Sequence, residues 1–127
     1  MNVAYIFRTN MSAIYQLATM ILPQLEKNIH KVNVVAMFFF DDNVYALEKN
    51  NQIGKRLEKI AEKNKILIMA CDQCALRRGL AEGSFNMCGT GSLRPKNMIK
   101  GAKVGCFPQL YSELSNCGKT VNYVITL

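Results

Sequence analysis

Two kinds of apolar pattern alternate along the chain. Five short segments are rich in β-branched and aromatic residues, and residues 32–40 (VNVVAMFFF) are apolar along nearly their whole length. Runs of this kind are typical of strands buried on both faces of a parallel sheet. The predicted strands are residues 2–7, 32–40, 65–70, 102–106 and 121–127.

Between these strands, apolar residues recur at helical spacing. In residues 51–64 they form one stripe among Lys, Arg and Glu, as in a surface helix that lies on a sheet. The predicted helices are residues 13–28, 51–64, 74–80 and 108–117. Ser12 is expected to cap the first helix, and Pro23 to kink or shorten it. Residues 83–100 show little periodicity and are expected to form the longest irregular segment, a lid or an interface loop.

The alternation of strands and helices predicts an α/β fold. We expect a three-layer sandwich, in which a five-stranded, mostly parallel sheet carries helices on both faces. A length of 127 residues fits one domain, residues 1–127. Ligands of such sheets bind at the carboxyl ends of the strands. We therefore expect a crevice beside Cys71 that is lined by Arg8, Asp41, Asn43 and Cys106, which all follow predicted strands.

Composition excludes several classes of function. The longest unbroken apolar run, residues 34–40, is far shorter than the ~20 residues that a membrane-spanning helix needs. The formal net charge of +7 is spread along the chain, without a basic run, zinc-finger pattern or RNA-recognition motif, so nucleic acid is not an expected partner. The first residues do not resemble a secretory signal, which predicts a cytoplasmic protein with reduced thiols.

The most informative motif is the sequence C-D-Q-C, which begins at Cys71 directly after a predicted strand and ends at Cys74. A thiol at a helix N-terminus faces free N–H groups and the positive end of the helix dipole, and both favour the nucleophilic thiolate. Asp72 opposes this effect, whereas Arg77 and Arg78 partly offset it. The motif is compatible with a dithiol redox pair, with half of a zinc site, or with two cysteines that have no chemical role.

Neither of the first two interpretations is complete. The chain has no Trp, and no Pro precedes its last predicted strand, unlike the thioredoxin pattern. Cys88, Cys106, Cys117 and the lone His30 offer no second closely spaced pair, so the spacing predicts no metal site. The roles of these three cysteines stay open, since a free cysteine is often a small buried hydrophobe.

Residues 71–79 (CDQCALRRG) closely resemble the active-cysteine segment of the DsrE-like sulfur-relay family, and Cys71 falls on the family's sulfur-accepting cysteine. Residues 38–44 (FFFDDNV) are similar to the aromatic strand end and turn of that family, and residues 99–110 to its loop and fourth strand. The chain departs from the family pattern at Cys74, where a small apolar residue is usual, and at Asn43, where Gly is common.

The resemblance implies a DsrE/YchN-like fold and a sulfur carrier, or sulfurtransferase-like protein, that accepts sulfane sulfur as a persulfide on Cys71. No metal, flavin or nucleotide cofactor is implied. Cys74 is expected to resolve the persulfide into a disulfide. The implied partners are sulfur donor and acceptor proteins, together with further copies of the chain in a trimer or hexamer, for which we expect residues 83–100 to form the interface. The alternatives are a CxxC dithiol redox protein and a non-catalytic oligomeric assembly module.

Overall fold

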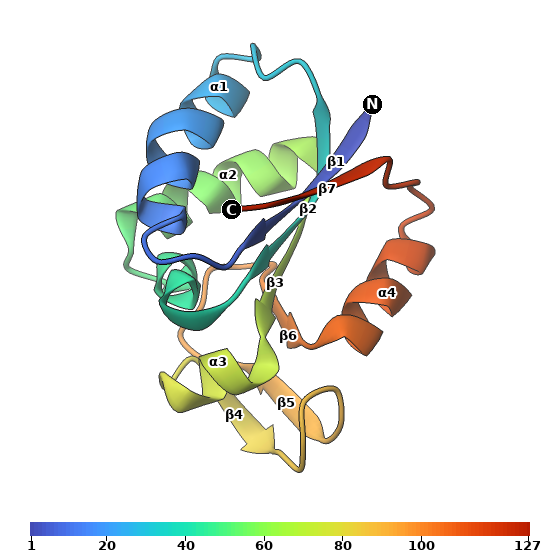
Figure 1. The fold of residues 1–127 in the computed structure, drawn as a ribbon. Helices are drawn as coiled ribbons and strands as arrows, with labels where there is room; N and C mark the ends of the chain where they lie inside the picture. The colour runs from blue at the N-terminus through green and yellow to red at the C-terminus, as the bar shows by residue number, and fades with distance from the viewer.

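Five parallel strands form the central sheet of the computed structural model, which describes residues 1–127. Their order is β6-β3-β2-β1-β7, so β3, β2 and β1 lie inside the sheet and β6 and β7 at its edges (Figure 1). The strands are β1 (Asn2–Phe7), β2 (Asn33–Phe39), β3 (Leu67–Cys71), β6 (Lys103–Gly105) and β7 (Tyr123–Thr126). All five predicted strands are confirmed, with shifts of one or two residues at their ends.

Helices cover both faces of this sheet, which confirms the predicted three-layer α/β sandwich. The π-helix η1 (Ala13–Ile21), α1 (Leu22–Glu26) and α2 (Gln52–Asn64) lie on one side of the sheet, and α4 (Phe107–Asn116) lies on the other (Figure 1). The larger core cluster contains buried residues of η1, α1 and α2 together with Phe7 and Phe39. A smaller cluster on the α4 side contains Phe38, Met69, Cys71 and Leu110. None of the helices has the length and apolar character needed to cross a membrane.

The first helix begins differently from the sequence-based prediction. Ser12 has helical backbone angles and makes no capping hydrogen bond. Instead, Asn43 caps the helix from another part of the chain, because its Oδ1 accepts the backbone N–H of Ala13 at 2.8 Å and the Ser12 hydroxyl at 3.2 Å. As predicted, Pro23 marks a change in the helix: the π-helix gives way to α1, and Pro23 occupies the first turn of α1.

Two further elements lie beside the carboxyl ends of β2 and β3. The 3-10 helix η2 (Asp41–Leu47) follows β2, and α3 (Asp72–Arg77) follows β3. Residues 83–100, which we expected to be irregular, contain most of an antiparallel hairpin, β4 (Ala81–Ser84) with β5 (Ser92–Pro95). Figure 1 shows α3 and this hairpin together at one end of the molecule. The prediction that residues 83–100 are irregular is thus partly wrong, because the β4–β5 hairpin is regular and lies next to the CxxC motif.

Candidate functional site

Cys71 lies where the sequence predicted it, at the junction between β3 and α3. It is the last residue of β3 and the N-cap residue of α3. Its pairing with Gly105 of β6 brings the next residue along that strand, Cys106, to the same edge of the sheet. The side chain of Cys71 is only 5% exposed and belongs to the apolar cluster on the α4 side of the sheet.

This burial controls the acidity of the thiol. The pKa of Cys71 is raised from 9.0 to about 12, mainly by burial and to a smaller extent by the side chain of Cys74 and the charge of Asp72. The backbone N–H of Cys74 lowers the pKa, as expected at a helix N-terminus, but no side-chain hydrogen bond of regular geometry caps α3. Access does not favour Cys71 over Cys74, since Cys71 is buried and Cys74 is the more exposed residue of the pair.

Cys74 faces the end of β2. Its Sγ lies 4.0 Å from Oδ1 of Asp41, at the start of η2, and makes at most a weak hydrogen bond there. Arg78 fixes α3 against η2, because its Nε donates to Asp42 at 2.9 Å and its Nη1 donates to the Cys74 carbonyl at 3.1 Å. The second thiol of the motif is therefore held at a partly open position between α3 and η2.

The four residues that we expected to line one crevice are divided between two places. Arg8, Asp41 and Asn43 line a cavity of about 420 Å³ at the carboxyl ends of β1 and β2. Asn43 is buried there, and its amide also donates to the Thr9 carbonyl at 3.0 Å, so it has a structural role in joining η2 to the loop after β1. Cys106 does not line this cavity but lies at the start of α4.

Asp72 is a buried carboxylate that sequence reasoning treated only as a modifier of the thiol. It is 4% exposed. Its Oδ1 accepts the backbone N–H of Gln73 at 2.7 Å, and its Oδ2 accepts the backbone N–H of Gly89 at 2.8 Å. The second bond attaches the loop between β4 and β5 to α3, which explains why the hairpin lies over this end of the sheet.

The same loop brings Cys88 to the site. One oxygen of Asp72 and the sulfur atoms of Cys88 and Cys106 all lie within 4.8 Å of one another. Burial, followed by the charge of Asp72, raises the pKa of the Cys88 thiol. Cys88 is 14 residues or more from every other cysteine in the sequence, so no local motif could have indicated this grouping.

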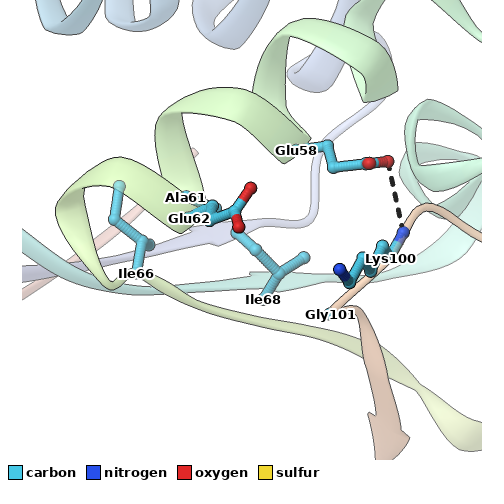
Figure 2. A pocket seen from close by; sticks show the side chains of 7 residues that line it. All are labelled: Glu58, Ala61, Glu62, Ile66, Ile68, Lys100 and Gly101. Atoms are coloured by element: carbon cyan, nitrogen blue, oxygen red, sulfur yellow. Dashed lines mark hydrogen bonds between the residues drawn. The ribbon is translucent and has the colours of Figure 1, made fainter.

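Another cavity, of about 190 Å³, lies between α2 and the segment that precedes β6 (Figure 2). Its lining includes Glu58, Glu62 and Lys100, and the Glu58 carboxylate accepts the backbone N–H of Lys100 at 3.2 Å. No cysteine or histidine lines this cavity. It therefore offers no thiol or imidazole, and the cysteines of the candidate site lie instead at the carboxyl ends of β3 and β6 and in the neighbouring hairpin.

Comparison with solved structures identifies the fold. The chain is similar to the YchN protein from E. coli (TM-score 0.60, 16% identity), and the match covers 99% of this chain and 98% of that one. It is also similar to two proteins of unknown function. MTH1491 from Methanobacterium thermoautotrophicum gives a TM-score of 0.57 at 13% identity, with 99% and 97% of the two chains covered. BT1422 from Bacteroides thetaiotaomicron gives 0.54 at 13% identity, with 99% and 94% covered.

These similarities confirm the YchN-like fold that the sequence predicted, over essentially the whole chain. No protein-family model and no curated protein sequence matches the chain. At such low identity the likeness concerns the fold alone, and the function has to be argued from the side chains.

Proposed function

We propose that the protein carries sulfane sulfur as a persulfide on Cys71 and passes it to a partner protein, with Cys74 as a second thiol that ends the cycle. The observation that carries the proposal is the position of the dithiol. Both cysteines lie at the carboxyl end of β3, an inner strand of the parallel sheet, and α/β proteins bind their ligands at such strand ends. The YchN-like fold and the resemblance of residues 71–79 to a sulfur-accepting segment support it.

The transfer balances without a cofactor. The Cys71 thiolate attacks the terminal sulfur of a donor persulfide, R–S–SH. The S–S bond of the donor breaks, R–S⁻ leaves and takes up the proton that Cys71 lost, and Cys71–S–SH forms. The thiolate of an acceptor protein then attacks the terminal sulfur of Cys71–S–SH, so that this S–S bond breaks, a persulfide forms on the acceptor and Cys71 leaves as a thiolate. If no acceptor docks, Cys74 attacks Sγ of Cys71, a Cys71–Cys74 disulfide forms and hydrogen sulfide leaves. In that step two thiol sulfurs are oxidised and the sulfane sulfur is reduced, and an external dithiol must reduce the disulfide before Cys71 can be loaded again.

Burial of Cys71 determines how such loading would proceed. At neutral pH the thiol is protonated because its pKa is raised to about 12, so it is a weak nucleophile in the resting structure. The sulfur lies in an apolar cluster with Phe38 and Leu110. Loading therefore requires α3 or α4 to move when a donor docks, and once the cluster closes again it shields the persulfide from thiols in solution.

Mass spectrometry of the intact protein tests the proposal after incubation with a donor persulfide. We expect a mass increase of one sulfur atom, which peptide mapping locates on Cys71. The Cys71→Ser variant should not be loaded. The Cys74→Ser variant should be loaded normally and should keep its persulfide for longer, because the resolving thiol is missing.

Cys117→Ser is the matched control, since Cys117 is exposed at the end of α4, outside the site. It should behave as the unchanged protein. Circular dichroism and the melting temperature of each variant establish that it is folded. A folded Cys71→Ser protein that still gains one sulfur atom on Cys74 would overturn the assignment of the carrier residue.

One observation favours a second candidate function, a dithiol redox protein. The side chain of Cys74 lies close enough to Cys71 to raise the pKa of the Cys71 thiol. Helical positions three residues apart place their Cβ atoms ~5–6 Å from each other, so a disulfide needs the first turn of α3 to loosen. Treatment with oxidised glutathione distinguishes the two functions: a redox protein loses the mass of two hydrogen atoms rapidly and without any sulfur donor.

A further inference from the structure

Three donor groups from distant parts of the chain converge beside α3. They are the carboxylate of Asp72, the thiol of Cys88 in the loop between β4 and β5, and the thiol of Cys106 at the start of α4. One ligand atom from each lies within 4.8 Å of the other two. The grouping lies next to the Cys71–Cys74 pair but uses neither of its sulfurs, and the persulfide cycle gives it no role.

Hydrogen bonds hold each of the three groups in place. Asp72 accepts backbone N–H groups from Gln73 and Gly89. Cys106 is the N-cap residue of α4, and its sulfur accepts the backbone N–H of Gln109 in a capping box. Gln109 reciprocates, since its Oε1 accepts the Cys106 N–H at 2.8 Å and its Nε2 donates to the Gly89 carbonyl at 2.9 Å. The loop that carries Cys88 is thus attached both to α3 and to α4.

Cys88 is itself in contact with a side-chain amide, that of Gln73, at 3.3 Å. The hydrogen-bonding partners of the Gln73 amide are matched best when its oxygen accepts from Nε and Nη2 of Arg77, at 3.2 and 2.7 Å. In this orientation the amide nitrogen faces the Cys88 sulfur. An N–H donor that faces a cysteine sulfur can donate a hydrogen bond to it once a metal ion has displaced the thiol proton. Both cysteines of the group have such a donor.

The charge of Asp72 is not balanced by any cationic side chain. The carboxylate is 4% exposed, and none of the four ion pairs of the chain includes it. Buried charges in proteins are normally paired with an opposite charge or coordinate a metal ion, because burial of an unpaired charge is costly. Its two hydrogen bonds to backbone groups offset part of this cost but supply no counter-charge.

We propose that Asp72, Cys88 and Cys106 form a binding site for a thiophilic divalent cation, and that Zn²⁺ is the ion that the donor set fits best. Two thiolates and one carboxylate match the preferences of zinc, and three protein ligands leave a fourth position of the tetrahedron open to water or to a sulfur ligand. Binding releases the two thiol protons to solvent and leaves a complex with one net negative charge.

The observed spacing is close to what such a complex needs. Tetrahedral zinc with Zn–S bonds of ~2.3 Å places its sulfur ligands ~3.8 Å apart. The ligand atoms lie within 4.8 Å, so the group has to contract by at most about 1 Å. Cys88 lies in a loop rather than in a helix or strand, and a small shift of this loop can supply the contraction.

Titration of the reduced full-length protein with Co²⁺, followed by displacement with Zn²⁺, tests the proposal. We expect a single Co²⁺ per chain, a sulfur-to-cobalt charge-transfer band in the near ultraviolet, and loss of that band when Zn²⁺ is added. Cys88→Ser and Cys106→Ser should each weaken Zn²⁺ binding more than about tenfold in competition with a chelator. Cys117→Ser should bind as the unchanged protein does.

Asp72→Asn tests the carboxylate, and because Asp72 also holds the loop, its folding has to be checked by circular dichroism. If Asp72→Asn does not fold, Cys88→Ser still tests the site, because Cys88 is only half-buried and its replacement is expected to leave the fold intact. Charge-transfer absorption that survives in the Cys88→Ser, Cys106→Ser double variant would overturn the proposal. So would absorption that disappears in Cys71→Ser or Cys74→Ser, because the metal would then bind the CxxC pair. The proposal is independent of the persulfide proposal, and either can fail alone.

Discussion

Asn43 in η2 accepts the backbone N–H of Ala13 through Oδ1 and donates through its amide to the carbonyl of Thr9. One buried side chain therefore caps η1 and fixes the loop that precedes it. In Asn43→Ala, the buried N–H of Ala13 and the partly exposed carbonyl of Thr9 lose their partners, and an unsatisfied buried donor typically costs ~1–3 kcal/mol. We expect the free energy of unfolding in urea to fall by about this amount.

Asn50→Ala is the matched control for that change. Asn50 is exposed, and its side chain makes no hydrogen bond. Its replacement should change stability by less than ~0.5 kcal/mol. If the Asn43 and Asn50 variants unfold at the same urea concentration, the cap contributes nothing to stability.

The raised pKa of Cys71 predicts a specific loss of stability in alkali. The thiol ionises near 9.0 when unfolded and near 12 when folded, so between these values the native state holds a proton that the unfolded state has lost. Stability must then fall as the pH rises through this range, by at most ~1.4 kcal/mol per pH unit from this group. Below pH 9 the contribution is fully present.

Chemical unfolding of the protein and of Cys71→Ser over this pH range measures the effect. The difference between the two removes the contributions of tyrosine and lysine, which titrate in the same range in both proteins. As the pH rises from 9 towards 12, we expect the free energy of unfolding of the unchanged protein to fall relative to that of Cys71→Ser. Parallel stability curves would mean that the Cys71 thiol ionises as easily in the folded protein as in the unfolded chain.

Gln109 is expected to hold the hairpin in place, because it bonds both to Cys106 and to the Gly89 carbonyl. Gly105 leaves room for this side chain, since a Cβ there would lie 2.7 Å from that of Gln109. Gln109→Ala should speed amide hydrogen exchange in the β4–β5 loop and should increase the rate at which Cys88 is alkylated. Ser112→Ala, at an exposed position of the same helix, should change neither rate.

Self-association remains a prediction, and the surface of the chain now gives two places to test it. We expected an interface in residues 83–100, where Met87 is an exposed large apolar side chain. A second apolar surface is a groove of about 220 Å³ between β1, β7 and α4 that is lined only by hydrophobic residues, Val124 among them. Light scattering of Met87→Glu and Val124→Glu shows which surface is used, and a strict monomer at micromolar concentration before any substitution contradicts both.

The sheet could be predicted because its strands have a strong local signal. β2 is buried over all but its first residue, and such a strand needs apolar side chains on both faces, which gives an unbroken run in the sequence. The hairpin could not be predicted in the same way. In β4 only Ala81 is buried and β5 has no buried residue, so neither strand shows the alternation of apolar and polar positions that marks a half-buried strand.

The candidate site was predictable only in part, for a related reason. Cys71 and Cys74 are close in sequence, and their position at the end of a strand follows from local patterns. The burial of Cys71 and the meeting of Cys88 with Asp72 and Cys106 depend on how α4 and the hairpin pack against α3, and those contacts join residues far apart in the chain. Sequence spacing carries no information about such contacts.

The pairing of β1 with β7 has a consequence for folding of the protein during its synthesis on the ribosome. Val3 lies opposite Tyr123, and Asn2 bonds to Asn122 and Thr120, so one edge of β1 stays unpaired until residues 120–126 have been synthesised. An unpaired strand edge can add to the edge of another chain. The nascent protein is therefore most exposed to misassembly just before its last strand emerges, and a chain truncated ahead of β7 should aggregate although its thiols and most of its core are present.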